Sequence, residues 1–153
     1  MKNTITRYGV YGFFTGFIIF ILHLVLGIKN LDYSTNEILG YISIFISLSF
    51  IYFGIKHYRD NINEGIISLG KAIIIGTLIS LMVGVGIGIA DFIYTEFIDP
   101  DFFKNYEQML IEKGREDEII EMTSTTAALF MVVLVSVIGF IISLLSGLFL
   151  QRK

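Results

Sequence analysis

Cysteine is absent from this chain of 153 residues. A chain without cysteine has no disulfide framework, no thiolate metal site and no cysteine nucleophile. Proline occurs once, at Pro100, outside the long apolar runs, so no such run is kinked by proline. Charged residues make up only 16% of the chain, and they cluster between the apolar runs. This clustering is not the pattern of amphipathic surface helices in an ordinary soluble domain.

Hydrophobic residues make up 54% of the chain, which is too apolar for a soluble fold of this length. Four runs are long enough to cross a bilayer, at residues 8–28, 38–55, 68–90 and 127–150. The basic start of the first run is also typical of a secretory signal peptide, but the run is longer than such a segment and lacks a small-residue cleavage site, so we interpret it as a retained span. We predict an all-α membrane protein, a single-domain four-transmembrane-helix bundle built from two hairpins.

The third run carries a small residue at every fourth position. This row consists of Ser68, Ala72, Gly76, Ser80, Gly84 and Gly88. Side chains four apart lie nearly above one another on a helix, so the row predicts a packing groove that lets a neighbouring backbone come close. Each step overshoots a full turn by about 40°, so we expect no single partner helix to cover the whole row. The third span is therefore the predicted packing centre, although small residues are also simply common in membrane helices.

The connection at residues 91–126 is unusually long for so small a protein. Asp91 is expected to end the third span. Asp99 followed by Pro100 is typical of a helix start, Gly114 is a suitable helix end, and a second polar helix is expected from about Asp117. The sequence therefore predicts an amphipathic helical loop between spans three and four, on the extracytoplasmic side.

The first helix of this loop carries an apolar stripe. The stripe consists of Phe102, Phe103, Tyr106, Met109 and Leu110. Such a stripe covers the end of its own bundle, a partner protein or the membrane surface; we favour the bundle, then a partner, because a Lys/Arg-rich polar face is missing. The many acidic residues of the loop are expected to form a solvated face, since their spacing matches no calcium-binding loop.

Basic residues indicate the orientation. On the side with both termini lie Lys2, Arg7, Lys56, Arg59, Lys71, Arg152 and Lys153, and on the other side lie Lys29, Lys104, Lys113 and Arg115. Because cytoplasmic loops carry the excess of lysine and arginine, both termini are predicted to be cytoplasmic.

Three stretches carry a family resemblance: residues 40–43 (Gly-Tyr-Ile-Ser), 53–60 (Phe-Gly-Ile-Lys-His-Tyr-Arg-Asp) and 65–72 (Gly-Ile-Ile-Ser-Leu-Gly-Lys-Ala). Here the sequence resembles domain-of-unknown-function family 4199, which comprises four-span bacterial inner-membrane proteins, and the resemblance extends over the whole chain. It implies topology and compartment, a multi-pass protein of the bacterial inner membrane, and no activity.

His23 is the only titratable side chain deep inside a span. An ionisable group there is a functional candidate for a proton relay or a ligand contact, but we favour a structural role in which a neutral imidazole bonds a neighbouring serine or carbonyl. Together with Asp91, at the glycine-rich end of span three, it is the candidate intramembrane polar site. The other histidine, His57, lies on the opposite side, so no histidine metal site is predicted within one chain.

Lys56, Arg59 and Lys71 converge between spans two and three on the predicted cytoplasmic side. Orientation and snorkelling account for them, and contact with a lipid headgroup phosphate is their best functional interpretation. Asp60 is expected to pair with Arg59 or Lys56, an exposed interaction of little energetic value.

The sequence offers no nucleophile with a base, no phosphate-binding glycine loop and no metalloprotease helix. We therefore predict no enzyme, no cofactor and no metal, and favour an accessory or assembly subunit that packs through small-residue helix faces and meets a partner with its acidic loop. The expected partners are membrane lipid, a second copy of the chain or another membrane protein; the net charge of −3 argues against nucleic acid. The alternative is an oligomeric small-solute or ion transporter or channel that uses His23 and Asp91.

Overall fold

The computed structural model of the chain describes residues 1–27 and 33–152, so Lys29 and Lys153 lie outside the described residues. The four long helices are α1 (Lys2–Gly27), α2 (Tyr33–His57), α3 (Leu69–Ile93) and α5 (Ser124–Leu150). Each belongs to a helical stretch that is long and apolar enough to cross a membrane. This confirms the prediction of an all-α protein with four membrane-spanning helices.

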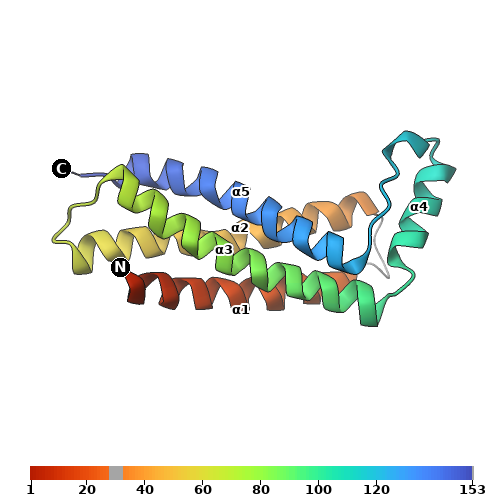
Figure 1. Cartoon of the computed structure of the whole chain (residues 1–153), viewed down its shortest axis with the longest axis horizontal. Coiled ribbons are helices and arrows are strands. Elements are labelled where there is room, and N and C mark those ends of the chain that lie inside the picture. The colour runs from red at the N-terminus through yellow and green to blue at the C-terminus, as the bar shows by residue number, and fades with distance from the viewer. Residues whose placement is uncertain (28–32, 153) are drawn as a thin grey trace.

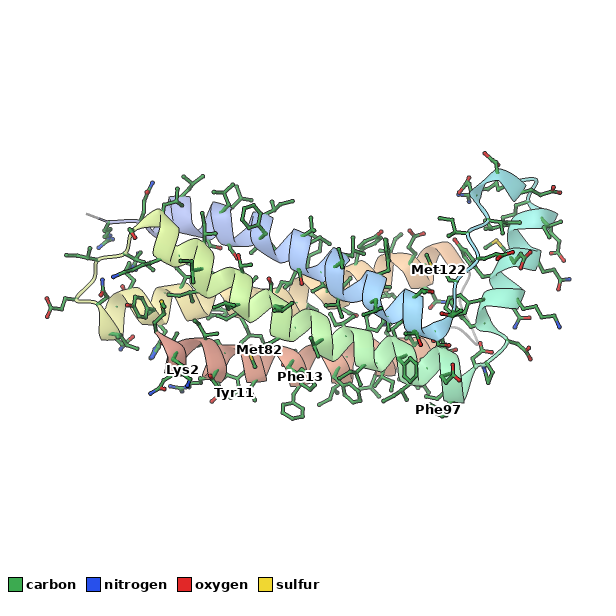
Figure 2. All side chains as sticks on the ribbon, in the orientation of Figure 1. Lys2, Tyr11, Phe13, Met82, Phe97 and Met122 are labelled. Carbon is green, nitrogen blue, oxygen red and sulfur yellow. The ribbon has the colours of Figure 1, made fainter. Side chains whose placement is uncertain are left out.

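The four helices lie side by side as an up-and-down bundle, with successive helices running in opposite directions (Figure 1). Both termini and the α2–α3 connection lie at one end, which we call the terminal end. The short helix α4 (Phe102–Glu112) lies across the other end, which we call the α4 end. Figure 2 shows side-chain nitrogen and oxygen atoms mainly at these two ends and carbon along the length between them. This distribution matches a bundle whose middle is surrounded by lipid.

The helices extend beyond the apolar runs. α1 begins at Lys2 and α2 at Tyr33, several residues before the predicted spans. α3 continues to Ile93 and leads directly into a π-helix, η2 (Tyr94–Ile98). The prediction that Asp91 ends the third span is therefore wrong, because Asp91 lies inside the helix. An apolar run stops where charged residues begin, whereas backbone hydrogen bonds continue through polar residues.

The segment between η2 and α5 contains less helix than predicted. α4 begins at Phe102, after the Asp99–Pro100 step that we expected to start it. Gly114 follows α4 with a φ of +67°, a left-handed conformation that suits the end of a helix. The helix expected from about Asp117 is only a single 3-10 turn, η3 (Glu116–Glu118). Three consecutive acidic residues repel one another and provide no apolar face to bury, so nothing extends this turn.

α3 is the central helix, in contact with α1, α2 and α5. Its small-residue row allows the backbone of α5 to come close. A Cβ atom placed on Gly84 would lie 3.0 Å from the backbone oxygen of Val132, and one on Gly88 would lie 2.9 Å from that of Ala128. Any larger side chain at these two positions would have to push α5 away.

α5 carries a matching row of small residues, and the two rows interlock. The facing pairs are Ala72 with Gly147, Gly76 with Ser143, and Ser80 with Gly139. One helix, α5, therefore follows the row from Ala72 to Gly88, while α2 also reaches it through Ile51 beside Gly76. The row as a whole, from Ser68 to Gly88, has no single partner, as predicted. Because the row on α5 drifts around its own axis in the same way, the two helices stay in register along their length. Ser68 is exposed and instead caps α3, accepting a hydrogen bond from the backbone nitrogen of Lys71 at 3.4 Å.

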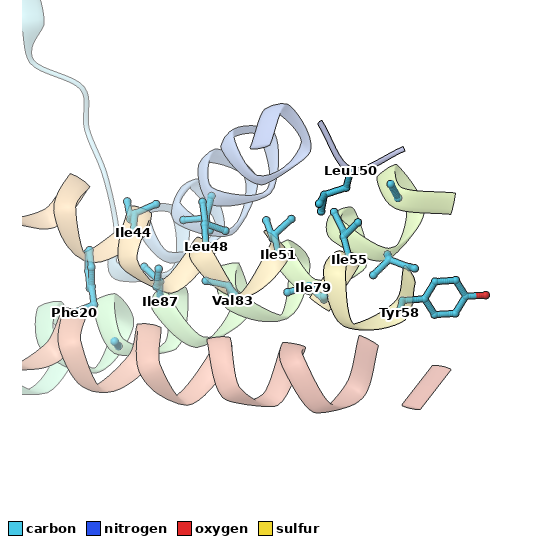
Figure 3. Close-up of a cluster of buried hydrophobic side chains, with 14 of the residues drawn as sticks. Phe20, Ile44, Leu48, Ile51, Ile55, Tyr58, Ile79, Val83, Ile87 and Leu150 are labelled. Carbon is cyan, nitrogen blue, oxygen red and sulfur yellow. The ribbon is translucent and has the colours of Figure 1, made fainter. Parts of the chain in front are cut away.

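Aliphatic side chains fill the space between α1, α2, α3 and α5 (Figure 3). Those with no exposed surface include Leu48, Ile51, Ile79, Val83 and Ile87. On α1, a Cβ placed on Gly12 would lie 2.5 Å from Cγ2 of Val83, and one on Gly16 would lie 3.0 Å from Cγ1 of Ile87. The axis of the bundle is thus occupied by packed apolar side chains.

Gly86 provides a direct test of this packing, because a Cβ there would lie 2.5 Å from the backbone oxygen of Phe13 on α1. Gly86→Ala should force α1 and α3 apart and lower the free energy of unfolding by about 1–3 kcal/mol. Thermal unfolding of the purified protein in detergent measures the loss. Gly70→Ala is the matched control, since no atom lies within 4 Å of its Cβ position, and it should leave the midpoint unchanged or slightly raised. Equal losses in both variants would contradict the packing described.

Candidate functional site

Arg59 is buried at the terminal end of the bundle. It lies in η1 (Tyr58–Ile62), a π-helix that directly continues α2. Its Nε donates to Oδ1 of Asp60 at 2.6 Å and its Nη2 to Oδ2 at 3.1 Å, while Nη1 donates to the backbone oxygen of Leu150 at 3.3 Å. A cation at the last carbonyl groups of a helix also interacts favourably with the helix dipole. Arg59 therefore ties the end of α2 to the end of α5.

The chain after α5 is held at the same place by backbone hydrogen bonds. Ile67 and Arg152 each donate their N–H to the carbonyl oxygen of the other, both at 3.1 Å. The structure thus separates the three residues predicted to contact lipid headgroups. Arg59 is engaged within the protein and with Asp60, whereas the side chains of Lys56 and Lys71 are exposed. Only these two lysines are free to reach a lipid phosphate, and that contact stays a prediction.

His23 packs between α1 and α2. Its ring meets that of Phe20 edge-on, with centroids 4.8 Å apart, and its Cε1 and Nε2 atoms lie 3.7 Å from the position of a Cβ on Gly40. Nδ1 of His23 is buried and has no hydrogen-bond partner. The imidazole therefore fills the space left by a glycine.

Asp91 is buried near the end of α3, with only 7% of its surface exposed. Its Oδ2 has no hydrogen-bond partner among residues 1–27 and 33–152. The hydroxyl of Thr95, one turn further on, donates to the backbone oxygen of Asp91 at 2.9 Å and not to the carboxylate. Within the part of the chain that the structure describes, no hydrogen bond or ion pair joins Asp91 to His23. Nor do the described residues include a group of three or more His, Asp or Glu placed to hold a metal ion.

α4 meets the bundle through Phe102 of its apolar stripe, and Leu110 of the stripe is buried. Phe102 packs its ring against the edge of Tyr94, with centroids 6.0 Å apart. The ring of Phe103 meets that of Phe102 edge-on, and the ring of Tyr106 stacks on that of Phe102 with centroids 6.4 Å apart. Met109 is half-buried. Phe102 thus contacts the end of its own bundle, as the first of the three alternatives expects for the stripe, while 40% of Tyr106 stays exposed.

The acidic residues of the α4 end form an exposed face. Those with exposed side chains are Glu96, Asp101, Glu107, Glu112, Glu116, Asp117, Glu118 and Glu121. Glu118 is paired with Arg115, whose Nε lies 2.7 Å from Oε1, and these hydrogen bonds hold the pKa of the Glu118 carboxyl below its usual value. The other exposed acids give this end a negative surface, as expected for a solvated face.

The match to a known family covers residues 7–152, and the family is described as "Protein of unknown function (DUF4199)". The chain belongs to this family. The match confirms the resemblance drawn above from the stretches at residues 40–43, 53–60 and 65–72. No curated protein and no solved structure matches this DUF4199 chain.

Sequence reasoning missed how Arg59 is used in this DUF4199 protein. Its hydrogen bond joins residues 91 positions apart, and the acceptor is the backbone oxygen of Leu150, a group that every residue has. Neither π-helix has a signal in the sequence. Arg59 follows the buried Ile51 and Ile55 at helical spacing on the inner face of α2, a position that the grouping of the basic residues alone does not reveal.

Arg59→Gln should lower the free energy of unfolding by about 1.5–3 kcal/mol, because a hydrogen bond from a charged donor to Leu150 is lost at a buried site. Lys56→Gln, one turn away and exposed, should change it by less than about 0.5 kcal/mol. Thermal unfolding in detergent micelles compares the two variants with the native chain. Similar values for both variants would show that Arg59 is not needed to join α2 and α5.

Proposed function

We propose that this DUF4199 protein is a non-enzymatic accessory or assembly subunit of a bacterial inner membrane. Its termini are cytoplasmic, and its α4 end meets a partner protein on the outer side. The observation that supports it best is the α4 end itself, an ordered surface that is both acidic and partly apolar. A surface held in place before binding loses less entropy on association than a disordered loop would.

The orientation is supported by the basic residues at the terminal end. Lys2 and Arg7 lie near the start of α1, Lys56 lies in the last turn of α2 and Arg59 in η1 directly after it, and Lys71 lies in the first turn of α3. All of these lie at the end of the bundle that carries both termini. Lysine and arginine concentrate on the cytoplasmic side of membrane proteins, so the α4 end is expected outside.

The surface available to a partner follows from the internal packing. The small-residue row of α3 is occupied by α5, so it does not serve as a docking groove for a partner helix. At the α4 end, Phe97 is 71% exposed and Ile120 is 72% exposed, and both are surrounded in sequence by acidic residues. Figure 2 shows Phe97 directed away from the bundle. Exposed aromatic and aliphatic side chains with a charged rim are typical of protein interfaces.

An oligomeric small-solute or ion transporter is the second candidate, and the unpartnered carboxylate of Asp91 favours it. Against it stands the aliphatic core, since Leu48, Ile51 and Val83 fill the axis of the bundle. A path through a single copy would have to pass between these side chains. Transport therefore requires several copies with the path between them.

A photoreactive residue at exposed Asn105 of α4 should give a discrete cross-linked product with a second protein in native membranes. The same residue at Ile141, half exposed on the lipid-facing side of α5, should not. If the acidic face is what binds, Glu107→Lys combined with Glu112→Lys should lower the yield at least several-fold, whereas Glu64→Lys at the terminal end should not. Equal cross-linking yields at Asn105 and Ile141 would contradict the proposal. So would a yield at Asn105 that charge reversal on α4 does not lower.

Because the chain contains no cysteine, the orientation is checked with the same positions. A membrane-impermeant maleimide added to intact cells should label Asn105→Cys and leave Glu64→Cys unlabelled. The reverse pattern would place α4 in the cytoplasm and overturn the outward orientation.

A further inference from the structure

Asp91 is the one buried carboxyl group in the described part of the four long helices, and it lies in the last turn of α3. No cation is paired with it among the described residues. Only 7% of its surface is exposed, and Oδ2 has no hydrogen-bond donor. The nearest hydroxyl along the helix, that of Thr95, is used by the backbone oxygen of Asp91. A buried carboxylate oxygen without a donor is costly, and a protein normally avoids that cost by neutralising the charge.

The elements packed against α3 supply little to neutralise it. At the α4 end, their titratable groups are His23 on α1, Glu37 and Tyr41 on α2, and Tyr94 and Glu96 in η2, and α5 supplies none. Lys104 and Lys113 at the two ends of α4 are exposed, and Arg115 is paired with Glu118. His23 is the only group of this set in α1, α2, α5 and η2 able to become a cation, and no bond joins it to Asp91 among the described residues. A second acid or a tyrosine brings no positive charge to offset a carboxylate.

The position of Asp91 also gives it a short route to water. η2 begins three residues later, and the side chain of Glu96 within it is exposed. Five residues of helix correspond to about 7 Å, whereas the start of α3 at the terminal end lies about 30 Å away. π-helices occur often at functional sites, because the wider turn interrupts the regular packing of the helix. A proton at Asp91 would therefore exchange with the solvent at the α4 end.

We propose that Asp91 is a reversible proton-binding site at the α4 end of the bundle. It is occupied, and the side chain neutral, when the helices are packed as described here, and losing the proton loosens the end of α3. The proposal does not depend on the partner-binding function or on transport, since a buried acid can bind a proton in either kind of protein.

Stability against pH tests the site, with Asp91→Asn as the neutral variant of nearly the same shape. In the unfolded chain an aspartate has its ordinary pKa of about 3.9. The stability that the neutral side chain contributes is therefore fully present below about pH 4 and is lost as the pH rises. In detergent, the native chain and Asp91→Asn should unfold at the same temperature near pH 4. At higher pH the midpoint of thermal unfolding of the native chain should be lower than that of the variant. The difference should grow by up to about 3–5 °C for each pH unit until the folded protein releases the proton.

Glu96→Gln, which removes an exposed acid five residues away, is the control and should follow the native chain at every pH. The infrared band of a protonated carboxyl group gives a second, direct readout: it should be present in the native protein near pH 5 and missing from Asp91→Asn. A native protein without this band, or an Asp91→Asn variant that is less stable than the native chain near pH 7 or fails to fold, would overturn the proposal. Each of those results would mean that the charged carboxylate is the form the fold needs.

Discussion

The close approach of α3 and α5 is the constraint on which the rest of the bundle depends. In lipid, helices gain little from burying apolar surface against one another, so their association depends on how closely they pack. The pairs of small residues from Ala72 with Gly147 to Gly88 with Ala128 allow this along nearly the whole length of α3. With α5 fixed there, its last residue, Leu150, lies within reach of Arg59, and the following Arg152 pairs with Ile67. The terminal end is thus a consequence of the central packing.

This use of the small residues changes what the protein offers to its surroundings. A groove that is filled by its own chain is not a surface for a partner, so the function has to be sought elsewhere. The α4 end combines an exposed acidic face with a helix that meets the bundle through Phe102. Asp91 lies in the last turn of α3, next to this end. It comes one turn before Tyr94, whose ring contacts Phe102 of α4. The proposed proton site and the proposed partner surface therefore lie at the same end of the molecule.

The sequence predicted the features that follow from solvent and spacing. Apolar run length gave four spans, and the four-residue repeat picked out α3, because both depend only on local pattern. Prediction from the sequence failed where the position or burial of a residue depends on contacts with residues far away in the chain. Asp91 was expected at a helix end because a charge usually ends an apolar run, yet the backbone continues and buries it. Arg59 was grouped with exposed lysines because its acceptor, a backbone oxygen of α5, has no signature. α5 follows the row of α3 from Ala72 to Gly88 because α5 has its own row of small residues. The row on α3 alone does not reveal this.

The most direct measurement of the central packing is a disulfide between α3 and α5 in native membranes. The two Cβ positions at residues 72 and 147 lie 3.1 Å apart, so Ala72→Cys with Gly147→Cys should form an intramolecular bond after a small shift. Cleavage at a protease site introduced after Gly114 would then leave the two fragments joined until a reductant is added. Ile74→Cys with Gly147→Cys is the control, because half of the Ile74 side chain is exposed on another face of α3. The account predicts joined fragments for the first pair only; separated fragments for that pair, or equal joining in both, would contradict it.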